Sequence, residues 1–334
     1  MRLTVLLGGT SSERNVSLAS GLRMAAALRE AGHEVRLLDP ATGMIKPPDE
    51  ERMRSRSVGA APPAAWELEA LRKADQTPTL PTHTLVRDAD CVVLALHGGQ
   101  GEDGTVQALL DVAGVRYTGS GAMATAIAMD KDMTKRILVH AGVPTAAWRM
   151  TPIDADTAIA ALGLPLIVKP NREGSTVGLT IVKIREQFDS AVAEAHQFDA
   201  EVMCERFVPG RELTVPVLAG EALPVGEIIA VKEIYDYECK YTPGMAREVF
   251  PADLPPAMTA LVQTHAVTAY TALKLRGCAR IDFRLTPEGE LACLEANTLP
   301  GMTALSLVPQ SAAAAGVNFV EFCDRLVRDA VADR

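Results

Sequence analysis

The chain lacks an excess of positive charge and has few aromatic side chains. Of its 334 residues, 33 are Lys or Arg and 42 are Asp or Glu, so the formal net charge is −9, and aromatic residues make up 4%. A nucleic-acid surface needs a basic stripe and side chains on which bases can stack. The composition therefore argues against a nucleic-acid partner and favours a small molecule.

Paired cysteines and long apolar runs are also lacking. The six cysteines form no C-x-x-C pair and no zinc-like spacing, and they are Cys91, Cys204, Cys239, Cys278, Cys293 and Cys323. We interpret them as buried, reduced thiols, which suggests a cytosolic protein. No stretch reaches the roughly 18 uncharged apolar residues of a membrane span, and the apolar run in MRLTVLLGGT is too short for the core of a signal peptide. We expect a cytoplasmic protein that does not enter a membrane.

The glycine fingerprint of dinucleotide binding is missing as well. The first turn, GGTSSERNVS, does not match G-x-G-x-x-G, which disfavours a nicotinamide-dependent enzyme. What is present is a βαβ rhythm: an apolar strand over 3–7, an amphipathic helix over 14–31, a second strand over 34–38 and a buried strand over 91–96. This rhythm predicts a parallel sheet with crossover helices.

The rest of the chain predicts further α+β units. Residues 40–84 are rich in proline, alanine and charge, so we expect a surface excursion with some disorder and a short helix over 64–73. The later patterns predict helices over 122–141, 188–195 and 257–275 and strands over 164–169, 178–183 and 200–207. We therefore expect an N-terminal α/β domain over 1–120 with a surface insert at 41–85, a central domain over 121–204 and a C-terminal domain over 205–334.

The stretch LEANTLPGMT points to a metal site. Glu295 and Asn297 are two positions apart on a strand and share one face, while Leu294 and Ala296 take the other. The sequence ARIDFRLTPEGELACLEAN predicts a hairpin that places Asp282 opposite or nearly opposite Glu295. Two carboxylates and an amide oxygen suit Mg²⁺ or Mn²⁺. A solvated polar face is the alternative, but the neighbouring residues are core-like, and carboxylates near a core are costly without a cation.

Three further residues could serve a nucleotide or substrate. In LIVKPNREGSTVG, Lys169 ends an apolar strand beside a Gly/Ser/Thr tip, a combination that suits phosphates. Taken alone, this segment fits a flexible surface hairpin with an interfacial lysine about as well. Together with the metal site, it favours a phosphate-binding role. Glu13 precedes a helix and could hold a substrate ammonium or simply cap the helix. His97, in HGGQGEDG, follows a strand at an edge where open α/β sheets bind ligands, or it is a structurally satisfied histidine.

Seven motifs, in this order, resemble the D-alanine–D-alanine ligases of the ATP-grasp superfamily: LLGGTSSERNVS, LHGGQGEDG, YTGSGAMATAIAMDK, PLIVKPNREGSTVG, YDYECKY, ARIDF and LEANTLPGMT. The resemblance covers nearly the whole chain except 41–85. It implies a three-domain ATP-grasp fold, in which an N-terminal Rossmann-like parallel sheet accompanies two antiparallel-sheet domains that clamp ATP. It also implies a homodimer and a reaction for peptidoglycan precursor synthesis, in which two D-alanines are joined through an acyl phosphate while ATP becomes ADP and phosphate.

The resemblance assigns the nucleotide and metal contacts. It implies Asp282, Glu295 and Asn297 as the Mg²⁺ ligands, in agreement with the strand-face argument. The ATP contacts it implies are Lys131 and Lys169 with the phosphates, Glu205 and Val208 with the adenine, Glu212 with the ribose hydroxyls and Lys240 with the transferred phosphate. Glu205 and Glu212 could instead be ordinary surface charges.

The resemblance also assigns the amino-acid contacts. Glu13 would hold the ammonium of the first D-alanine, and Ser175 and Tyr241 would link to Glu13 by hydrogen bonds. The remaining substrate contacts that it implies are His97 at the first substrate, Arg280 and the Gly301 N–H at the tetrahedral intermediate, and Ser306 and Leu307 at the carboxylate of the second D-alanine. The segment with Tyr241 predicts an amide rather than a depsipeptide product.

Two features depart from the family pattern. The insert at 41–85 could be a dimer contact or a disordered loop. Leu299 stands where family members tend to carry a small polar residue, beside the expected intermediate site, and could reshape the second-substrate pocket. Two alternatives remain besides the nicotinamide enzyme: an ATP-grasp ligase for another amino acid or a hydroxy acid, and a nucleotide-binding regulatory protein that ligates nothing.

Overall fold

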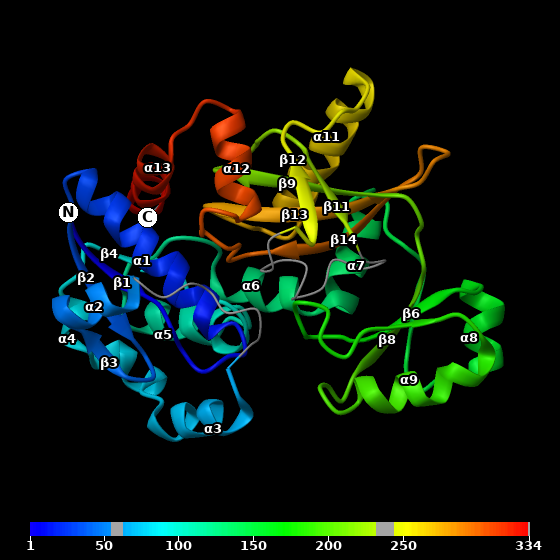
Figure 1. Cartoon of the computed structure of the whole chain (residues 1–334), viewed down its shortest axis with the longest axis horizontal. Coiled ribbons are helices and arrows are strands. Elements are labelled where there is room, and N and C mark those ends of the chain that lie inside the picture. Colours follow the sequence, from blue (N-terminus) through cyan, green and yellow to red (C-terminus); the bar gives the residue numbers. More distant parts are fainter. Residues whose placement is uncertain (55–62, 232–243, 333–334) are drawn as a thin grey trace.

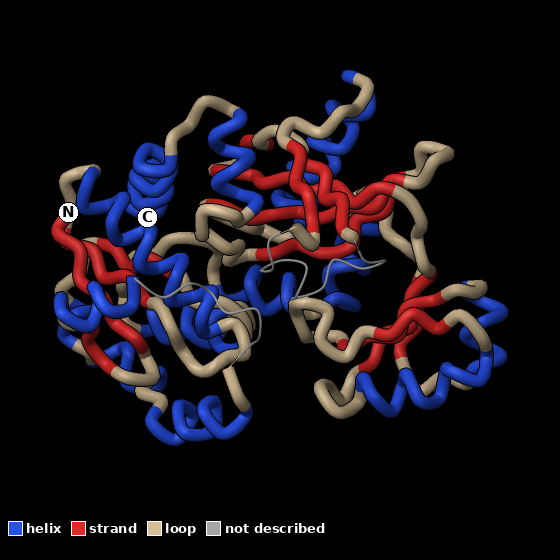
Figure 2. The backbone as a smooth tube through the Cα atoms, in the orientation of Figure 1, coloured by secondary structure: helices blue, strands red, loops and turns tan. Residues whose placement is uncertain are grey.

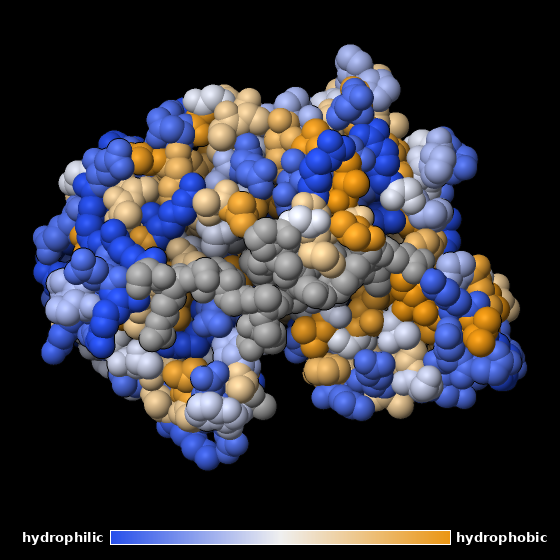
Figure 3. Space-filling model, in the orientation of Figure 1, coloured by the Kyte–Doolittle hydropathy of each residue, from blue (hydrophilic) through white to orange (hydrophobic). Residues whose placement is uncertain are grey.

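The computed structural model of the protein describes residues 1–54, 63–231 and 244–332. Within these residues the strands form three sheets, one in each of three lobes (Figure 1, Figure 2). On the face shown in Figure 3, hydrophilic and hydrophobic side chains are interspersed. Among the described helices, none is long and apolar enough to span a bilayer.

The N-terminal lobe is built on a sheet in the order β3-β2-β1-β4. Strand β1 (Arg2–Leu6) pairs in parallel with β2 (Glu34–Asp39) and β4 (Cys91–Leu94), and helix α1 (Arg14–Glu30) makes the first crossover. The parallel βαβ arrangement is therefore confirmed. Strand β3 (Gly43–Ile45) adds an antiparallel edge that the sequence did not indicate.

The insert after β2 is more structured than expected. It contains α2 (Pro47–Arg54), α3 (Ala65–Ala74), the 3₁₀ helix η1 (Thr77–Thr82) and α4 (Thr84–Arg87). Its second half is not a surface excursion, because Leu80 and Leu85 are buried in one apolar cluster with Leu6 and Leu94 of the sheet. The short helix predicted over 64–73 is confirmed as α3. Residues 55–62 lie outside the described residues.

The helical pattern over 122–141 is interrupted. After η2 (Gly99–Gly101) and α5 (Thr105–Val112), helix α6 (Ala122–Met129) ends before Asp130, and α7 (Lys131–His140) begins just after it. The Asp130 carboxylate accepts from the backbone N–H of Met133 and so caps α7. The prediction of one continuous helix is wrong because this aspartate has a better hydrogen-bonding role at a helix start than inside a helix.

The central lobe has an antiparallel sheet in the order β5-β8-β6-β7. Its strands are β5 (Trp148–Met150), β6 (Leu166–Pro170), β7 (Thr180–Val182) and β8 (Val202–Arg206). Helix α8 (Ala155–Leu162), the 3₁₀ helix η3 (Arg185–Gln187) and helix α9 (Phe188–Ala195) complete this lobe. The predicted β6–β7 hairpin is confirmed.

The third lobe has a larger antiparallel sheet in the order β12-β11-β9-β13-β14, with β10 beside β9. Its strands are β9 (Arg211–Leu218), β10 (Glu221–Ala222), β11 (Gly226–Ala230), β12 (Ala246–Val249), β13 (Cys278–Leu285) and β14 (Leu291–Asn297), and its helices are α11 (Pro256–Ala272) and α12 (Leu307–Ala314). The last helix, α13 (Phe319–Ala332), lies beside α1 (Figure 1). Its Phe322 and Val327 are buried in one cluster with Leu3 and Leu28, so the end of the chain completes the N-terminal core.

Candidate active site

Two adjoining cavities lie between the lobes. The first is lined by the central and C-terminal sheets and contains Lys131, Lys169, Glu205, Val208, Glu212 and Asp282. The second lies against the N-terminal lobe and contains Glu13, His97, Asn297, Gly301, Ser306 and Leu307. Ser175, Arg280 and Glu295 line both. Every predicted site residue within the described ranges therefore lines one of these cavities; Lys240 and Tyr241 lie outside those ranges.

The β13–β14 hairpin presents the expected oxygen donors. Asp282 pairs directly with Glu295, which confirms the predicted register. The register then shifts between Asp282 and Phe283, because Phe283 pairs with Cys293 and leaves Leu294 as an extra residue. This bulge disrupts the alternation of faces. The expectation that Leu294 faces away from the site is wrong, because Leu294 lines the first cavity together with Glu295.

The oxygen atoms of this hairpin suit a hard cation. Asn297 Oδ1 is buried and has no hydrogen-bond partner among the described residues. The carboxylate of Asp282 accepts from Thr214 Oγ1 at 2.7 Å and from Arg280 at 2.8 to 3.1 Å. A buried oxygen without a partner is costly, and a cation would satisfy it. The described residues hold no cluster of three or more His, Cys, Asp or Glu side chains suited to a metal, so a zinc-type centre is not indicated there.

Two lysines contact one buried carboxylate at the first cavity. Glu205 is 3% exposed, its Oε2 accepts from Lys169 Nζ at 2.7 Å, and its Oε1 contacts Lys135 Nζ. Burial alone would raise the pKa of Glu205, but Lys169 and Lys135 outweigh it and lower that pKa to about 2. Burial lowers the pKa of both Lys131 and Lys135. The interpretation of Glu205 as a surface charge is therefore wrong.

Glu212 and Lys131 are also held in place at the first cavity. Glu212 Oε2 accepts from Arg284 Nη1 at 3.1 Å, so this glutamate is a paired group of the cavity wall rather than a free surface charge. Lys131 Nζ donates to the carbonyl of Glu173 at 2.6 Å and lies 3.9 Å from Glu295 Oε2. Lys131 thus lies between the loop that follows β6 and the candidate metal ligands.

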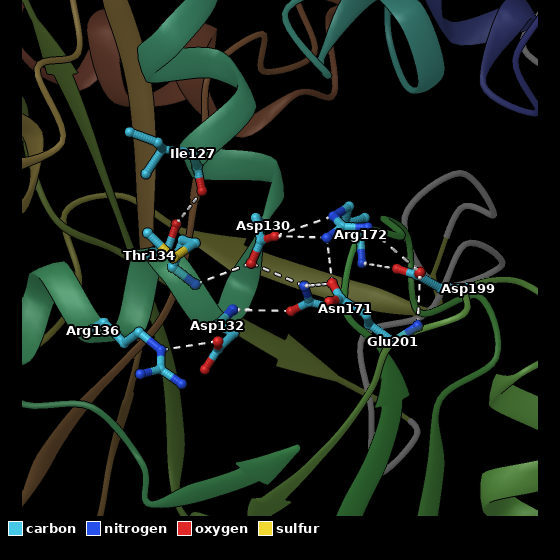
Figure 4. A network of polar contacts seen from close by, with 10 residues as sticks. Ile127, Asp130, Asp132, Thr134, Arg136, Asn171, Arg172, Asp199 and Glu201 are labelled. Atoms are coloured by element: carbon cyan, nitrogen blue, oxygen red, sulfur yellow. Dashed lines mark hydrogen bonds and ion pairs between the residues drawn. The ribbon is translucent and has the colours of Figure 1, made fainter. Parts of the chain in front are cut away.

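A polar network ties this loop to the start of α7 (Figure 4). The Asn171 side chain accepts from the Asp132 N–H and donates to Asp130 Oδ1, each at 2.9 Å. Arg172 forms ion pairs with Asp130 and Glu201. Since Lys131 lies between Asp130 and Asp132 in the chain, the network fixes Lys131 relative to Lys169, which lies near the end of β6.

The loop after β6 contacts the N-terminal lobe through Ser175. Its Oγ donates to Glu13 Oε1, as expected for the first-substrate site. Ser175 and Thr176 have φ values of 51° and 61°, a backbone region that non-glycine residues rarely adopt, and such strain is common at ligand clamps. The side chain of Glu13 makes no capping hydrogen bond to α1. The capping interpretation of Glu13 is therefore wrong.

His97 is buried and has partners on both ring nitrogens. Nδ1 lies 2.8 Å from the carbonyl of Leu299, and Nε2 lies 3.0 Å from Ser20 Oγ. Burial lowers the pKa of His97, but Glu102 and then Glu13 outweigh burial, so that its pKa is raised overall. His97 therefore has hydrogen-bond partners inside the protein and also lines the second cavity, so the two interpretations of this residue do not exclude each other.

The glycine-rich loop after β14 fits tightly around Ser306. A Cβ added to Gly301 would lie 2.7 Å from Ser306 Oγ, so a side chain at this position would displace the Ser306 hydroxyl. Ser306 Oγ accepts from the Thr303 N–H at 3.0 Å, and Ser306 precedes helix α12 without capping it through its side chain. The N-terminus of α12, which begins at Leu307, is therefore open toward the second cavity, where a helix dipole favours a carboxylate.

The end of β2 is not a dinucleotide site. In Rossmann enzymes an acidic residue near this place accepts the ribose hydroxyls. Here Asp39 is fully buried and accepts from the N–H groups of Gly9 and Ala41 and from Arg14 and Thr42. Its carboxylate is already satisfied inside the protein, which disfavours the nicotinamide-dependent alternative.

Two family models together match most of the chain: D-ala D-ala ligase N-terminus over 2–120 and D-ala D-ala ligase C-terminus over 137–328. The chain belongs to the D-alanine–D-alanine ligase family. A D-alanine–D-alanine ligase from Aquifex aeolicus is 42% identical and aligns over 96% of this chain and 97% of that protein. One from Synechococcus sp. (strain JA-2-3B'a(2-13)) is 39% identical over 99% of this chain and 93% of that protein.

Solved ligases of the family have the same fold. The crystal structure of a D-alanine–D-alanine ligase from Bacillus anthracis matches with a TM-score of 0.78 at 32% identity, covering 100% of this chain and 98% of that one. The same enzyme complexed with ATP matches with a TM-score of 0.76 at 30% identity, covering 100% and 97%. The ligase from Coxiella burnetii gives 0.80 at 25% identity, covering 99% and 94%. The expected ATP-grasp fold is thereby confirmed.

Some residues that build this ligase site were not identified from the sequence. They are Lys135, Asn171, Thr214, Ser20 and Arg23. Lys135 had a usable signal, since it lies four positions after Lys131 and therefore on the same face of α7. Thr214 is a fully buried polar residue between the apolar Leu213 and Val215 of strand β9. The roles of Ser20 and Arg23 depend on contacts with residues 282 and 279 positions away, for which no local pattern exists.

Proposed function

We propose that this protein is a cytoplasmic D-alanine–D-alanine ligase, which joins two D-alanines while ATP is converted to ADP and phosphate, for peptidoglycan precursor synthesis. The observation that carries this proposal is the contact between the two cavities at Arg280 and Glu295. A nucleotide in the first cavity would direct its phosphates toward that contact, and an amino acid in the second would meet them there.

In the first cavity, the roles of the side chains follow from their charges. Lys131 and Lys169 would neutralise phosphate oxygens, and Glu212 would accept from the ribose hydroxyls. Glu205 and Val208 would contact the adenine, with Lys135 and Lys169 holding the Glu205 carboxylate in place. Mg²⁺, or Mn²⁺ in its place, would add charge neutralisation between phosphates.

The proposed metal ligands are Asp282, Glu295 and Asn297. The unpartnered Asn297 Oδ1 supports this set most directly. Asp282 has a second role in the proposal, because it also orients Arg280 through their ion pair.

The first half of the reaction activates one D-alanine. Glu13, held by Ser175, would bind its ammonium and turn its carboxylate toward the shared wall of the cavities. An oxygen of that carboxylate then attacks the terminal phosphorus of ATP, the bond to the bridging oxygen breaks, and ADP leaves. Catalysis of such a transfer comes chiefly from positioning and charge neutralisation.

The second half forms the amide. The neutral amine of the second D-alanine, whose carboxylate would lie at Ser306 and the N–H of Leu307, attacks the acyl carbon. The charge that grows on the carbonyl oxygen would be stabilised by Arg280 and the Gly301 N–H, and such a donor is typically worth about 3 kcal/mol. The bond between the acyl carbon and the phosphate oxygen then breaks, the nitrogen gives up one proton, which the leaving phosphate can carry away, and D-alanyl-D-alanine remains.

Several parts of the proposal rest on the family resemblance alone. They are Lys240 at the transferred phosphate, Tyr241 at Ser175 and Glu13, the homodimer, and the domain limits at residues 120 and 204. His97 is included as a residue of the second cavity, where it contacts the loop that carries Gly301.

The deciding experiment measures phosphate release and product mass with Mg·ATP and one of D-alanine, L-alanine or D-alanine plus D-lactate. The proposal requires release that depends on D-alanine and yields D-alanyl-D-alanine. Release with another amino acid only, or a depsipeptide formed in preference at neutral pH, would assign a ligase of different specificity. Binding of ATP without release under any of these conditions would leave the regulatory protein as the better interpretation.

A further inference from the structure

The N-terminal lobe holds the loop that carries Gly301, in addition to the contact that this loop makes with Ser306 of its own lobe. This loop, residues 299–303, follows β14 of the C-terminal lobe. Three groups of the N-terminal lobe hydrogen-bond to its backbone: the His97 ring after β4, and the side chains of Ser20 and Arg23 on α1. The loop backbone is therefore positioned from across the second cavity.

One chain of hydrogen bonds connects the backbone before Gly301, at Leu299, with the backbone after it, at Met302. The carbonyl of Leu299 can only accept, so His97 Nδ1 carries the proton that it receives. Ser20 Oγ lies 3.0 Å from His97 Nε2 and also accepts from the Met302 N–H at 3.0 Å, so this hydroxyl links the ring to the loop backbone. The two ends of this chain fix the residues on either side of Pro300 and Gly301.

Arg23 and Leu299 add two further anchors. Arg23 Nη1 donates to the carbonyls of Met302 and Thr303, each at 2.8 Å, while its guanidinium lies 3.6 Å from the ring centre of Phe319 in α13. The side chain of Leu299 is 7% exposed and packs in the apolar cluster of the N-terminal sheet. The leucine that departs from the family pattern thus serves as an apolar anchor for the loop.

We propose that Ser20 and Arg23 are positioning residues for the second half of the reaction: they set where the Gly301 N–H points and where the second D-alanine lies. This inference rests on the proposed ligase function. The same helix, α1, starts just after Glu13, the proposed ligand of the first D-alanine. One rigid element would therefore set both substrate positions relative to each other, because a helix holds its ends at a fixed distance.

The test separates the two halves of the reaction in Ser20→Ala and Arg23→Met. Acyl-phosphate formation is followed by adding hydroxylamine, whose nitrogen attacks the acyl carbon and releases phosphate to give D-alanyl hydroxamate. Amide formation is followed as D-alanyl-D-alanine. We expect hydroxamate formation to stay within about twofold of the wild type, while the KM for the second D-alanine rises, or kcat for the dipeptide falls, by about tenfold.

Two control variants distinguish positioning from general damage. Ser17 is another fully buried serine of α1, and its hydroxyl bonds inside the N-terminal lobe to the carbonyl of Ala95. Ser17→Ala should lower stability as much as Ser20→Ala does, with the wild-type ratio of dipeptide to hydroxamate. Arg23→Lys can still donate to one loop carbonyl, so it should recover part of the activity lost in Arg23→Met.

The outcomes are distinct from those that test the function itself. If the wild type forms no dipeptide, the proposed function fails and the variants are irrelevant. If the wild type forms dipeptide but Ser20→Ala and Arg23→Met lose hydroxamate and dipeptide in equal proportion, or lose neither, the positioning role is overturned. The same holds if Ser17→Ala shifts the ratio as strongly as Ser20→Ala does.

Discussion

At the scale of single residues, the candidate metal site depends most directly on one buried oxygen atom that has no partner among the described residues. Asn297 Oδ1 is buried without a partner among the described residues, and Glu295 lies at the border of both cavities. Native proteins leave few buried acceptors unpaired. A cation bound to Asn297 Oδ1 would satisfy this buried acceptor, which would otherwise cost free energy.

Glu295→Gln tests this interpretation. The amide keeps the shape of the side chain but removes one ligand charge, so we expect the Mg²⁺ concentration for half-maximal phosphate release to rise by about tenfold or more. Saturating Mg²⁺ should restore only part of the turnover. Glu288→Gln is the matched control, because Glu288 is exposed in the turn of the same hairpin. An unchanged Mg²⁺ dependence in Glu295→Gln would refute the assignment.

The buried charges around Glu205 make a second prediction, for stability against pH. The pKa of Glu205 is lowered to about 2 by Lys169 and Lys135 despite burial. A carboxyl with a depressed folded-state pKa contributes stability that is fully present above its unfolded pKa of about 4.5 and is lost as the pH falls toward 2. Glu205→Gln leaves buried lysines unpaired, so we expect it to lower the free energy of unfolding at pH 7 by about 3 kcal/mol.

Urea unfolding of both proteins measures this effect. The difference in unfolding free energy between wild type and Glu205→Gln should be largest near pH 7 and shrink as the pH is lowered below about 4.5. A difference that stays constant from pH 7 to pH 3.5 would mean that the charge of Glu205 does not provide the stability.

Residue types alone identified part of this site. Asp282 and Glu295 could be paired from the turn between them and the period of two, since both are local properties. The spacing of Lys135 from Lys131 was a usable signal, but Arg23 could not be assigned a role, because an arginine on a helix is usually solvated and only the folded structure shows what it contacts.

At the scale of secondary-structure elements, the junction of α6, α7 and β6 positions two lysines. Asn171 directly follows β6 and bonds to both residues that flank Lys131. Asn171→Asp keeps the size of the side chain but places a charged oxygen beside the carboxylates of Asp130 and Glu201. We expect this repulsion to move α7 and to raise the KM for ATP by about tenfold, with a smaller effect on the KM for D-alanine.

A second asparagine provides the control. Asn318 Oδ1 accepts from the Glu321 N–H at the start of α13, and aspartate serves equally well at a helix start. Asn318→Asp should therefore leave the KM for ATP unchanged. Steady-state kinetics at saturating D-alanine measures the KM for ATP of the two variants. An equal KM in both would show that Asn171 does not position Lys131.

Elements were predicted well where their patterns were long and local. Helix α1 and strand β4 follow directly from periodicity and apolar runs. The break at Asp130 and the bulge at Leu294 were missed because each depends on one side chain or one extra residue that a periodic pattern averages out.

At the scale of the whole molecule, the site exists only where the three lobes meet. Neither cavity belongs to one lobe, and helix α13 at the end of the chain packs into the core that begins with β1. A sequence can indicate which elements form, but how lobes pack depends on contacts between distant residues. The arrangement of the three lobes was therefore expected from the family resemblance, and no local pattern in the sequence predicted it.

The hydrogen bond between Ser175 and Glu13 is one such contact, joining residues of the central and N-terminal lobes. If these lobes close over the acyl phosphate to exclude water, Ser175→Ala should open a path for hydrolysis. We expect the ratio of phosphate released to dipeptide formed to rise from one in the wild type to clearly above one. Ser190→Ala is the control, since the exposed Ser190 donates to the carbonyl of Gln187 within the central lobe. A ratio that stays at one in Ser175→Ala, even with slower turnover, would show that this contact orients Glu13 without keeping water from the intermediate.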